Sequence, residues 1–185
     1  MNRRRKSFRI LPLSYFAQKC MKRGDKVAQM QQIFLEKAYK SACSAGHIFP
    51  EIAACEAAIE SAWGQSRLAL EANNLFGQKQ SHPPLAGSGT LTLPTQEFLH
   101  NQWVNVAANW VRFACWNDCF QARMALLKRL SRAYPHYAAA LSAQTGEDFA
   151  TQVSRSWSTD PERAAKVLAI HDQHRSSFVA LRDAA

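Results

Sequence analysis

The sequence predicts an α+β fold that is predominantly helical and contains one small β-hairpin. Three observations lead to this fold class. Apolar residues recur at helical spacing over most of the chain, helix start and stop signals bracket those stretches, and two β-leaning segments lie next to each other near the middle. With 185 residues, 47% of them hydrophobic, the chain can bury one good core but not two. We therefore expect one globular domain.

The first half of the chain predicts three helices. Asp25 can cap a helix that runs to about Ala45. Pro50 stands where a first helical position would be, and small apolar residues continue the second helix up to Gly64. A third, shorter helix is predicted over residues 66–72.

The middle of the chain predicts a loop and a β-hairpin. Residues 79–89 are rich in Pro, Gly and Ser, which is typical of a loop. The segments TLTLPTQEFLH (90–100) and QWVNVAANWVRF (102–113) follow, and we expect them to pair through a turn at 100–102. Pro94 marks the first strand as an edge or irregular strand.

The last third of the chain is again helical. Its predicted helices cover 117–132, 135–142, 146–156 and the stretch from Asp160 onward. Thr159 and Glu162 have the spacing of a capping box, and Pro161 stands in the first turn. The last helix therefore has the best-marked start in the chain.

The basic charge of the chain is concentrated at its beginning. The net charge is +9, and residues 1–23 hold eight basic residues and no acidic one. The remainder has fifteen basic and fourteen acidic residues, so it is nearly neutral. We expect residues 1–24 to form a flexible basic tail that can contact an acidic surface, and 25–185 to form the globular domain. Specific nucleic-acid binding is not expected of that domain.

Export, membrane and metal signals are weak. Arg3 to Lys6 resembles the start of a signal peptide, but the apolar stretch after it is short, contains Pro12 and lacks a small-residue cleavage site. No run approaches the ~18 apolar residues of a membrane span. His171 and His174 lack the carboxylates or cysteines that would complete a metal site. We expect no cleavable signal, no transmembrane segment, no metal and no cofactor.

One carboxylate, Glu60, stands in a run of small apolar residues. If the helix runs to Gly64, Glu60 and Trp63 share a face of its last turn. The negative end of the helix dipole and the adjacent indole would then favour the protonated form. Such an acid can protonate a departing sugar oxygen, so Glu60 is a candidate general acid. Like Glu56 and Glu71, it could also be an ordinary solvated helix residue.

The stretch IESAWGQSRLALEANNLFGQK, residues 59–79, resembles the signature of the family 73 glycoside hydrolases. Weaker similarity continues through LPTQEF and SWSTDPERAAKVL. This family comprises bacterial and phage β-N-acetylglucosaminidases that cut peptidoglycan, and it includes the muramidase-like domain of the flagellar rod-cap protein. The resemblance implies a lysozyme-like fold with its cleft between a helical lobe and the hairpin.

The resemblance also implies roles for individual residues. Glu60 is similar to the essential acid of the family, and Glu97 to its second carboxylate, which would activate a water or stabilise positive charge in the transition state. An exposed strand position is the alternative for Glu97. Residues expected to shape or line the cleft are Trp63, Asn73, Asn74, Phe76, Gly77 and Trp157. A structural role, with the two asparagines holding a turn and Phe76 in the core, is an equal alternative for that element.

Two positions depart from the family pattern. Relatives often carry an aspartate where this chain has Ala122, and a tyrosine where it has Trp157. Alanine cannot ionise or accept a hydrogen bond, whereas tryptophan keeps an aromatic wall without the phenol.

The leading hypothesis is a peptidoglycan hydrolase that cleaves the β-1,4 bond after N-acetylglucosamine. The alternatives are a lytic transglycosylase on the same fold and a catalytically weak glycan-binding or assembly module, which Ala122 allows. Inverting, retaining and substrate-assisted mechanisms all stay open, because they depend on a carboxylate separation that sequence does not give. The substrate is in the cell wall, so export by a phage, flagellar or other dedicated system is a further hypothesis.

Overall fold

The computed structural model describes residues 23–99 and 102–184, and the side chains at 96–99 and 103 also lie outside the description. Residues 1–22 of the predicted basic tail and the hairpin turn at 100–101 therefore fall outside the described part, whereas Arg23 and Gly24 belong to the first helix. The elements are α2 (Arg23–Ser44), α3 (Pro50–Glu60), α4 (Arg67–Ala72), β1 (Gly89–Leu99), β2 (Gln102–Arg112), α5 (Trp116–Leu130), α6 (Pro135–Leu141), α7 (Gly146–Trp157), α8 (Arg163–Gln173) and α9 (Arg175–Asp183). The predicted fold class, mostly helical with one hairpin, is confirmed.

Backbone contacts divide the chain into Met1–Gln32 and Ile33–Ala185. The first unit contributes the beginning of α2, whereas the hydrophobic core, the hairpin and Glu60 belong to the second unit. The predicted boundary after residue 24 stays a prediction. Within residues 23–99 and 102–184, no helix is both long and apolar enough to cross a bilayer.

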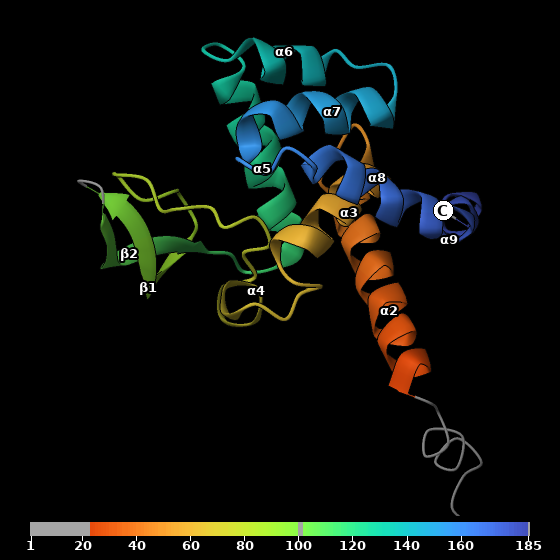
Figure 1. Cartoon of the computed structure of the whole chain (residues 1–185), viewed down its shortest axis with the longest axis horizontal. Coiled ribbons are helices and arrows are strands. Elements are labelled where there is room, and N and C mark those ends of the chain that lie inside the picture. Colours follow the sequence, from red (N-terminus) through yellow and green to blue (C-terminus); the bar gives the residue numbers. More distant parts are fainter. Residues whose placement is uncertain (1–22, 100–101, 185) are drawn as a thin grey trace, which may run out of the picture. The chain divides into compact units, whose positions relative to one another are not determined.

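Helix α3 lies at the centre of the core. It is buried continuously from Ile52 to Ala58, because every residue there except Glu56 is small or apolar. A helix that is apolar on all sides must be covered on all sides. Helices α8 and α7 pack directly against α3. Helix α6 packs against α7, and α5 packs against α6, as Figure 1 shows.

The β-hairpin is a two-stranded antiparallel sheet. Its register runs from Gly89 opposite Arg112 to Leu99 opposite Gln102. Pro94 lies within the paired stretch, opposite Ala107. Because β1 pairs only with β2 in the described sheet, its outer edge has no strand beside it, and a residue without an N–H is tolerated there.

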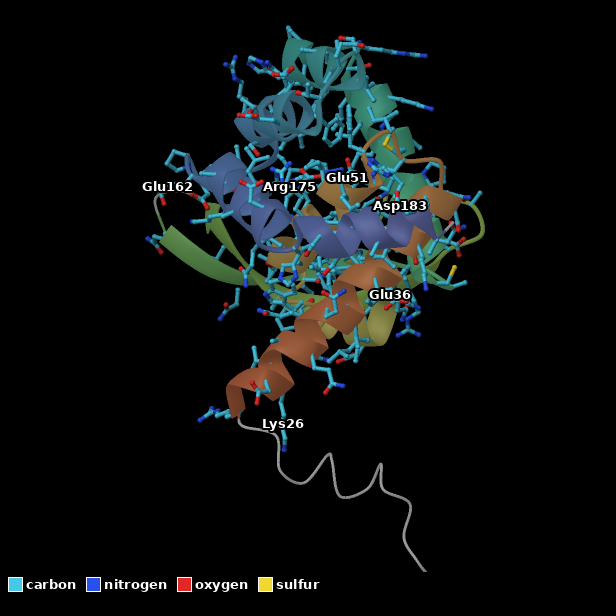
Figure 2. The ribbon with its side chains drawn as sticks, turned by 90° about the vertical axis from the view of Figure 1, so that its right-hand side faces the viewer. Lys26, Glu36, Glu51, Glu162, Arg175 and Asp183 are labelled. Atoms are coloured by element: carbon cyan, nitrogen blue, oxygen red, sulfur yellow. The ribbon has the colours of Figure 1, made fainter. Side chains whose placement is uncertain are left out.

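The C-terminal segment differs from the prediction in two ways. It forms two helices, which meet at His174, instead of one. Figure 2 shows α9 with Arg175 at its start and Asp183 at its end. The predicted capping box at Thr159 is wrong, because Asp160 Oδ1 accepts the N–H of Glu162 at 3.0 Å and Glu162 makes no side-chain cap.

Candidate active site

Glu60 is the last residue of α3, at the point where the buried helix reaches the surface. Its side chain is 24% exposed, whereas Glu56, one turn earlier, is completely buried. The carboxyl group of Glu60 is therefore held by the core and still open to solvent on one side. A side chain that contacts a substrate must be accessible in this way.

The chain leaves α3 through a left-handed turn. Ala62, Trp63 and Gly64 all have positive φ angles, of 50°, 57° and 77°. Ser61 stabilises the turn, since its Oγ donates to the carbonyl of Ala57 at 2.6 Å and accepts the N–H of Gly64 at 2.8 Å. Two successive non-glycine residues in this region are costly, and such strain is concentrated at functional sites in proteins.

This turn overturns one expectation. Because α3 ends at Glu60, Trp63 does not share a helix face with Glu60, as the sequence predicted. The indole of Trp63 instead packs edge-on against the rings of Phe34, at 6.1 Å, and His174, at 6.2 Å. Direct contact between Trp63 and substrate stays a prediction.

Arg163, from the first turn of α8, holds Glu60 in place. Its Nε donates to Glu60 Oε1 at 2.9 Å, while its Nη1 donates to Glu56 Oε1 at 2.9 Å and to Ser154 Oγ at 3.0 Å. The second oxygen of Glu56 accepts from Arg123 Nη2 at 2.6 Å. Two carboxylates and two guanidinium groups therefore form one connected and formally neutral network, the Glu56 network (Glu56, Glu60, Arg123 and Arg163).

The two arginines of the Glu56 network remain cationic in different surroundings. Burial lowers the pKa of Arg123, and the carboxylate of Glu56 opposes this shift. Burial also acts to lower the pKa of Arg163, but Glu56 and Glu60 outweigh it, so the pKa of Arg163 is raised. The guanidinium group of Arg123 lies over the rings of Phe76, at 4.5 Å, and Trp157, at 4.7 Å. Aromatic faces thus compensate part of the lost hydration of this cation.

The Asn-Asn-Leu-Phe-Gly element fastens α4 to the base of the hairpin. Asn73 caps α4 in a left-handed conformation and donates to the carbonyls of Phe113 and Ala114, each at 3.1 Å. Asn74 is buried, and its amide donates to Val111 and Gln78 at 2.9 Å each. Both asparagines therefore have a structural task, and sugar contact by either stays a prediction.

The aromatic residues beside this element form one side of the Glu56 network. Phe76 is 6% exposed and packs edge-on against Phe120, at 5.3 Å, and Trp157, at 6.3 Å. Trp157 ends α7 and is only partly buried. Gly77 has a φ of 62°, and a side chain there would meet the ring of Trp110 at 3.9 Å. A cleft-lining role for Phe76, Gly77 and Trp157 stays a prediction.

Glu97 is described by its backbone alone. It lies in β1 opposite Val104, close to the distal end of the hairpin, and its side chain falls outside the description. Its proposed role as second carboxylate is therefore not tested.

One of the described cavities adjoins the candidate site. One of about 630 Å³ lies between the end of α7 and the start of α8 and includes Ser154, so it adjoins the Glu56 network. Its volume is within the usual range for ligand pockets. Hydroxyl groups contribute much of its lining, from Thr151, Ser154, Ser158 and Thr159.

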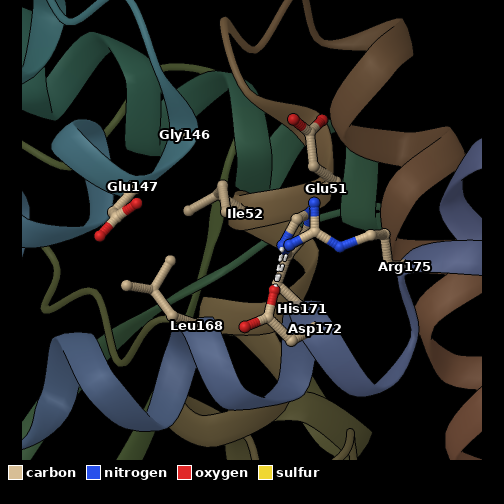
Figure 3. A pocket seen from close by; sticks show the side chains of 8 residues that line it. All are labelled: Glu51, Ile52, Gly146, Glu147, Leu168, His171, Asp172 and Arg175. Atoms are coloured by element: carbon tan, nitrogen blue, oxygen red, sulfur yellow. Dashed lines mark hydrogen bonds and ion pairs between the residues drawn. The ribbon is translucent and has the colours of Figure 1, made fainter.

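The pocket in Figure 3 is separate from Glu60. It encloses about 300 Å³ near the start of α3, where Glu51 lines it, and Arg175 pairs with Asp172 at one side. Glu60 is at the opposite end of α3, about 14 Å along the helix axis from Glu51. The remaining lining residues are Ile52, Gly146, Glu147, Leu168 and His171.

Sequence reasoning missed three members of the Glu56 network. The solvated alternative is correct for Glu71, which is exposed and pairs with Arg67, but it is wrong for Glu56. A charge one turn before Glu60, in an otherwise apolar helix, could have indicated a buried partner. Nothing local marked Arg123 or Arg163, which come from α5 and α8.

Solved structures of similar fold identify the architecture. The catalytic domain of the autolysin Auto from Listeria monocytogenes matches with a TM-score of 0.70 and 23% identity, covering 90% of this chain and 97% of that one. A C-terminally truncated glycoside hydrolase domain of FlgJ from Salmonella typhimurium matches with a TM-score of 0.62 and 24% identity, covering 79% of this chain and 98% of that one. The fold is lysozyme-like.

The family follows from the sequence comparison. The glucosaminidase family model, described as mannosyl-glycoprotein endo-beta-N-acetylglucosaminidase, matches residues 36–176. The chain belongs to this family and is a glycoside hydrolase, which confirms the resemblance drawn from residues 59–79.

Two curated relatives are similar over most of this chain. The exo-glucosaminidase LytG of Bacillus subtilis is 29% identical over 69% of this chain and 45% of its own length. A probable N-acetylmuramidase of Lactococcus lactis is 27% identical over 77% of this chain and 33% of its own length. The chain thus spans less than half the length of these relatives.

Proposed function

We propose that this chain hydrolyses the β-1,4 glycosidic bond after N-acetylglucosamine in peptidoglycan, with Glu60 as the general acid. The observation that carries the proposal is the position of Glu60. It is a partly exposed carboxyl group at the end of a buried helix, fixed through one oxygen by Arg163. The glucosaminidase family match supports the substrate class.

In the proposed reaction, Glu60 gives its proton to the glycosidic oxygen while the C1–O bond breaks. The electron pair of that bond goes to the departing oxygen, and a water adds to C1 to complete hydrolysis. Glu97 would accept the proton of that water or stabilise the positive charge at C1. Glu60 becomes a carboxylate in this step, and the guanidinium group of Arg163 at 2.9 Å stabilises the charge it acquires.

The names of the relatives point to two different bonds. One is an exo-glucosaminidase and another a probable N-acetylmuramidase. Cleavage after N-acetylglucosamine is proposed here because the matching family model carries a glucosaminidase description. Product analysis decides between the two bonds.

The test is a digest of purified sacculi by wild type and by Glu60→Gln. Loss of the acid should lower kcat by roughly 10²–10⁴-fold, the usual contribution of a general acid. Wild-type products should carry a reducing N-acetylglucosamine end, found by mass analysis. A transglycosylase would release products lighter by one water.

Glu71→Gln is the matched control, because Glu71 is an exposed glutamate of α4 paired with Arg67. It should digest sacculi at the wild-type rate. Full activity of Glu60→Gln would refute the acid assignment. A wild type that binds sacculi and releases no sugar would support a glycan-binding module.

A further inference from the structure

Among the described side chains, Glu60 forms hydrogen bonds through one oxygen alone. Oε1 accepts from Arg163 Nε, and no bond to Oε2 is found in the described part of the chain. The Arg163 side chain is 2% exposed, so its guanidinium group cannot turn away into solvent. The orientation of the Glu60 carboxyl group therefore depends on what holds Arg163.

Arg163 is held by a second carboxylate and by a hydroxyl. Glu56 and Ser154 both accept from Nη1, while Nε is left for Glu60. Two different nitrogens of one planar group thus bind two different carboxylates. A planar fork fixes direction in a way that the single ammonium of lysine does not.

Glu56 also shares the charge of Arg163. A guanidinium group beside a carboxyl group favours the ionised carboxylate, which cannot donate a proton. Glu56 is fully buried and pairs with both Arg123 and Arg163, so the charge of Arg163 is shared between two carboxyl groups. Arg123 of α5 and Arg163 of α8 both interact electrostatically with Glu56 and with Glu60.

We propose that Arg163 is a positioning residue for the general acid, and that Glu56 both orients Arg163 and moderates its charge. The bond from Nε fixes Oε1 and leaves Oε2 to present the proton. The same bond stabilises the carboxylate that forms when the proton leaves. This inference rests on the proposed function of Glu60.

The central variants change Arg163 and Glu56 separately and together. Arg163→Met leaves buried Glu56 with one partner fewer, so it endangers folding. The double variant Glu56→Gln/Arg163→Met removes one charge of each sign, but it leaves buried Arg123 without a carboxylate partner, so it endangers folding as well. Both should lower kcat by about 10²-fold with little change in KM, because the acid is present but misdirected.

The pH–rate profile separates positioning from simple structural support. Loss of Arg163, alone or in the double variant, should displace the alkaline limb of kcat relative to wild type, because the cation that is bonded to the proposed general acid is gone. Glu56→Gln alone should displace that limb in the opposite direction, because Arg163 then lacks its second carboxylate. Compared with Arg163→Met, Arg163→Lys should bring the pH–rate profile part of the way back to that of wild type. It should recover little of the lost kcat.

Arg67→Met is the matched control, since Arg67 is an exposed arginine of α4. Its kcat and pH profile should equal those of wild type. All variants are compared by circular dichroism before the assay. Folded Arg163 and double variants with wild-type kcat and an unmoved alkaline limb would overturn the inference.

These experiments distinguish a failure of the positioning inference from a failure of the proposed function. If wild type cleaves sacculi and Glu60→Gln does not, the acid assignment stands whatever Arg163 does. If Glu60→Gln is fully active, the acid assignment fails first and the positioning inference falls with it.

Discussion

His47 is a buried histidine that ties stability to pH. It is 5% exposed, and its Nδ1 accepts the N–H of Phe49 at 3.2 Å. Burial, assisted by the charge of Arg123, lowers its pKa from 6.5 to about 3. The unfolded chain binds this proton below pH 6.5 and the folded chain does not, so stability falls as pH falls. From pH 6.5 to 5 the free energy of unfolding should decrease by roughly 2 kcal/mol, measured by urea titration.

His47→Asn is the control for this pH dependence. Asparagine can accept the N–H two residues ahead, as His47 does, but it does not titrate in this range. Its loss of stability between pH 6.5 and 5 should be smaller than that of wild type by the same amount. Equal slopes for the two proteins would contradict the assignment to His47.

At the residue scale, sequence predicted Glu60 but not its surroundings. Glu60 was recognisable because its neighbours from Ser61 to Gly77 are close in the chain and form a specific pattern. Its partner Arg163 is 103 residues away, and Arg123 is 67 residues from Glu56. Pairing at such separation depends on how α3, α5 and α8 pack, which local patterns do not encode.

The turn after α3 is strained at a position that substitution can relax. Ala62 is exposed and has a φ of 50°, where a Cβ costs about 1–2 kcal/mol. Ala62→Gly should remove that cost and add back about 0.4–1 kcal/mol of unfolded-state entropy. We expect no destabilisation and a gain of up to about 1 kcal/mol, measured by urea unfolding.

Ala139→Gly tests the sign of this effect. Ala139 is also exposed but lies within α6, where glycine costs about 1 kcal/mol relative to alanine. This variant should be less stable than wild type. If both glycine variants lose stability equally, the strain at Ala62 is absent.

At the element scale, the sequence predicted which segments form helices and strands more accurately than the residues at which those elements end. The hydrophobic periodicity and the Gly, Pro and capping residues indicated the helices and the hairpin, because both signals depend on residues that are close in the chain. The end of α3 was missed because two non-glycine residues turn left-handed before Gly64 does. The break at His174 was missed because no Gly or Pro marks it, and the N-cap of α8 is Glu162 instead of Thr159.

The whole chain carries its charge unevenly, and this should control its adhesion to anionic surfaces. Deleting residues 1–23 removes eight basic residues and changes the net charge from +9 to +1. The truncated chain should elute from a cation exchanger at much lower salt, because exposed charges act through a screened field. Cleavage of soluble glycan fragments should be unchanged.

A full-length variant with those eight residues changed to Gln separates charge from length. It should elute with the truncated chain. Elution of either protein at the wild-type salt concentration would place the basic surface within residues 24–185 instead.

The hairpin has a mechanical consequence. It is fastened near Val111 by Asn74 and by the bridge between Lys79 and Trp110, whereas Glu97 lies towards the far end. The eight residue steps from Gly89 to Glu97 span about 26 Å. A tilt of about 10° at the fastened end would carry the backbone at Glu97 by roughly 4–5 Å, because a long arm magnifies a small rotation. The carboxylate spacings of retaining and inverting glycosidases differ by only about 1–4.5 Å, so a second carboxylate carried at Glu97, as proposed, requires a firmly held hairpin.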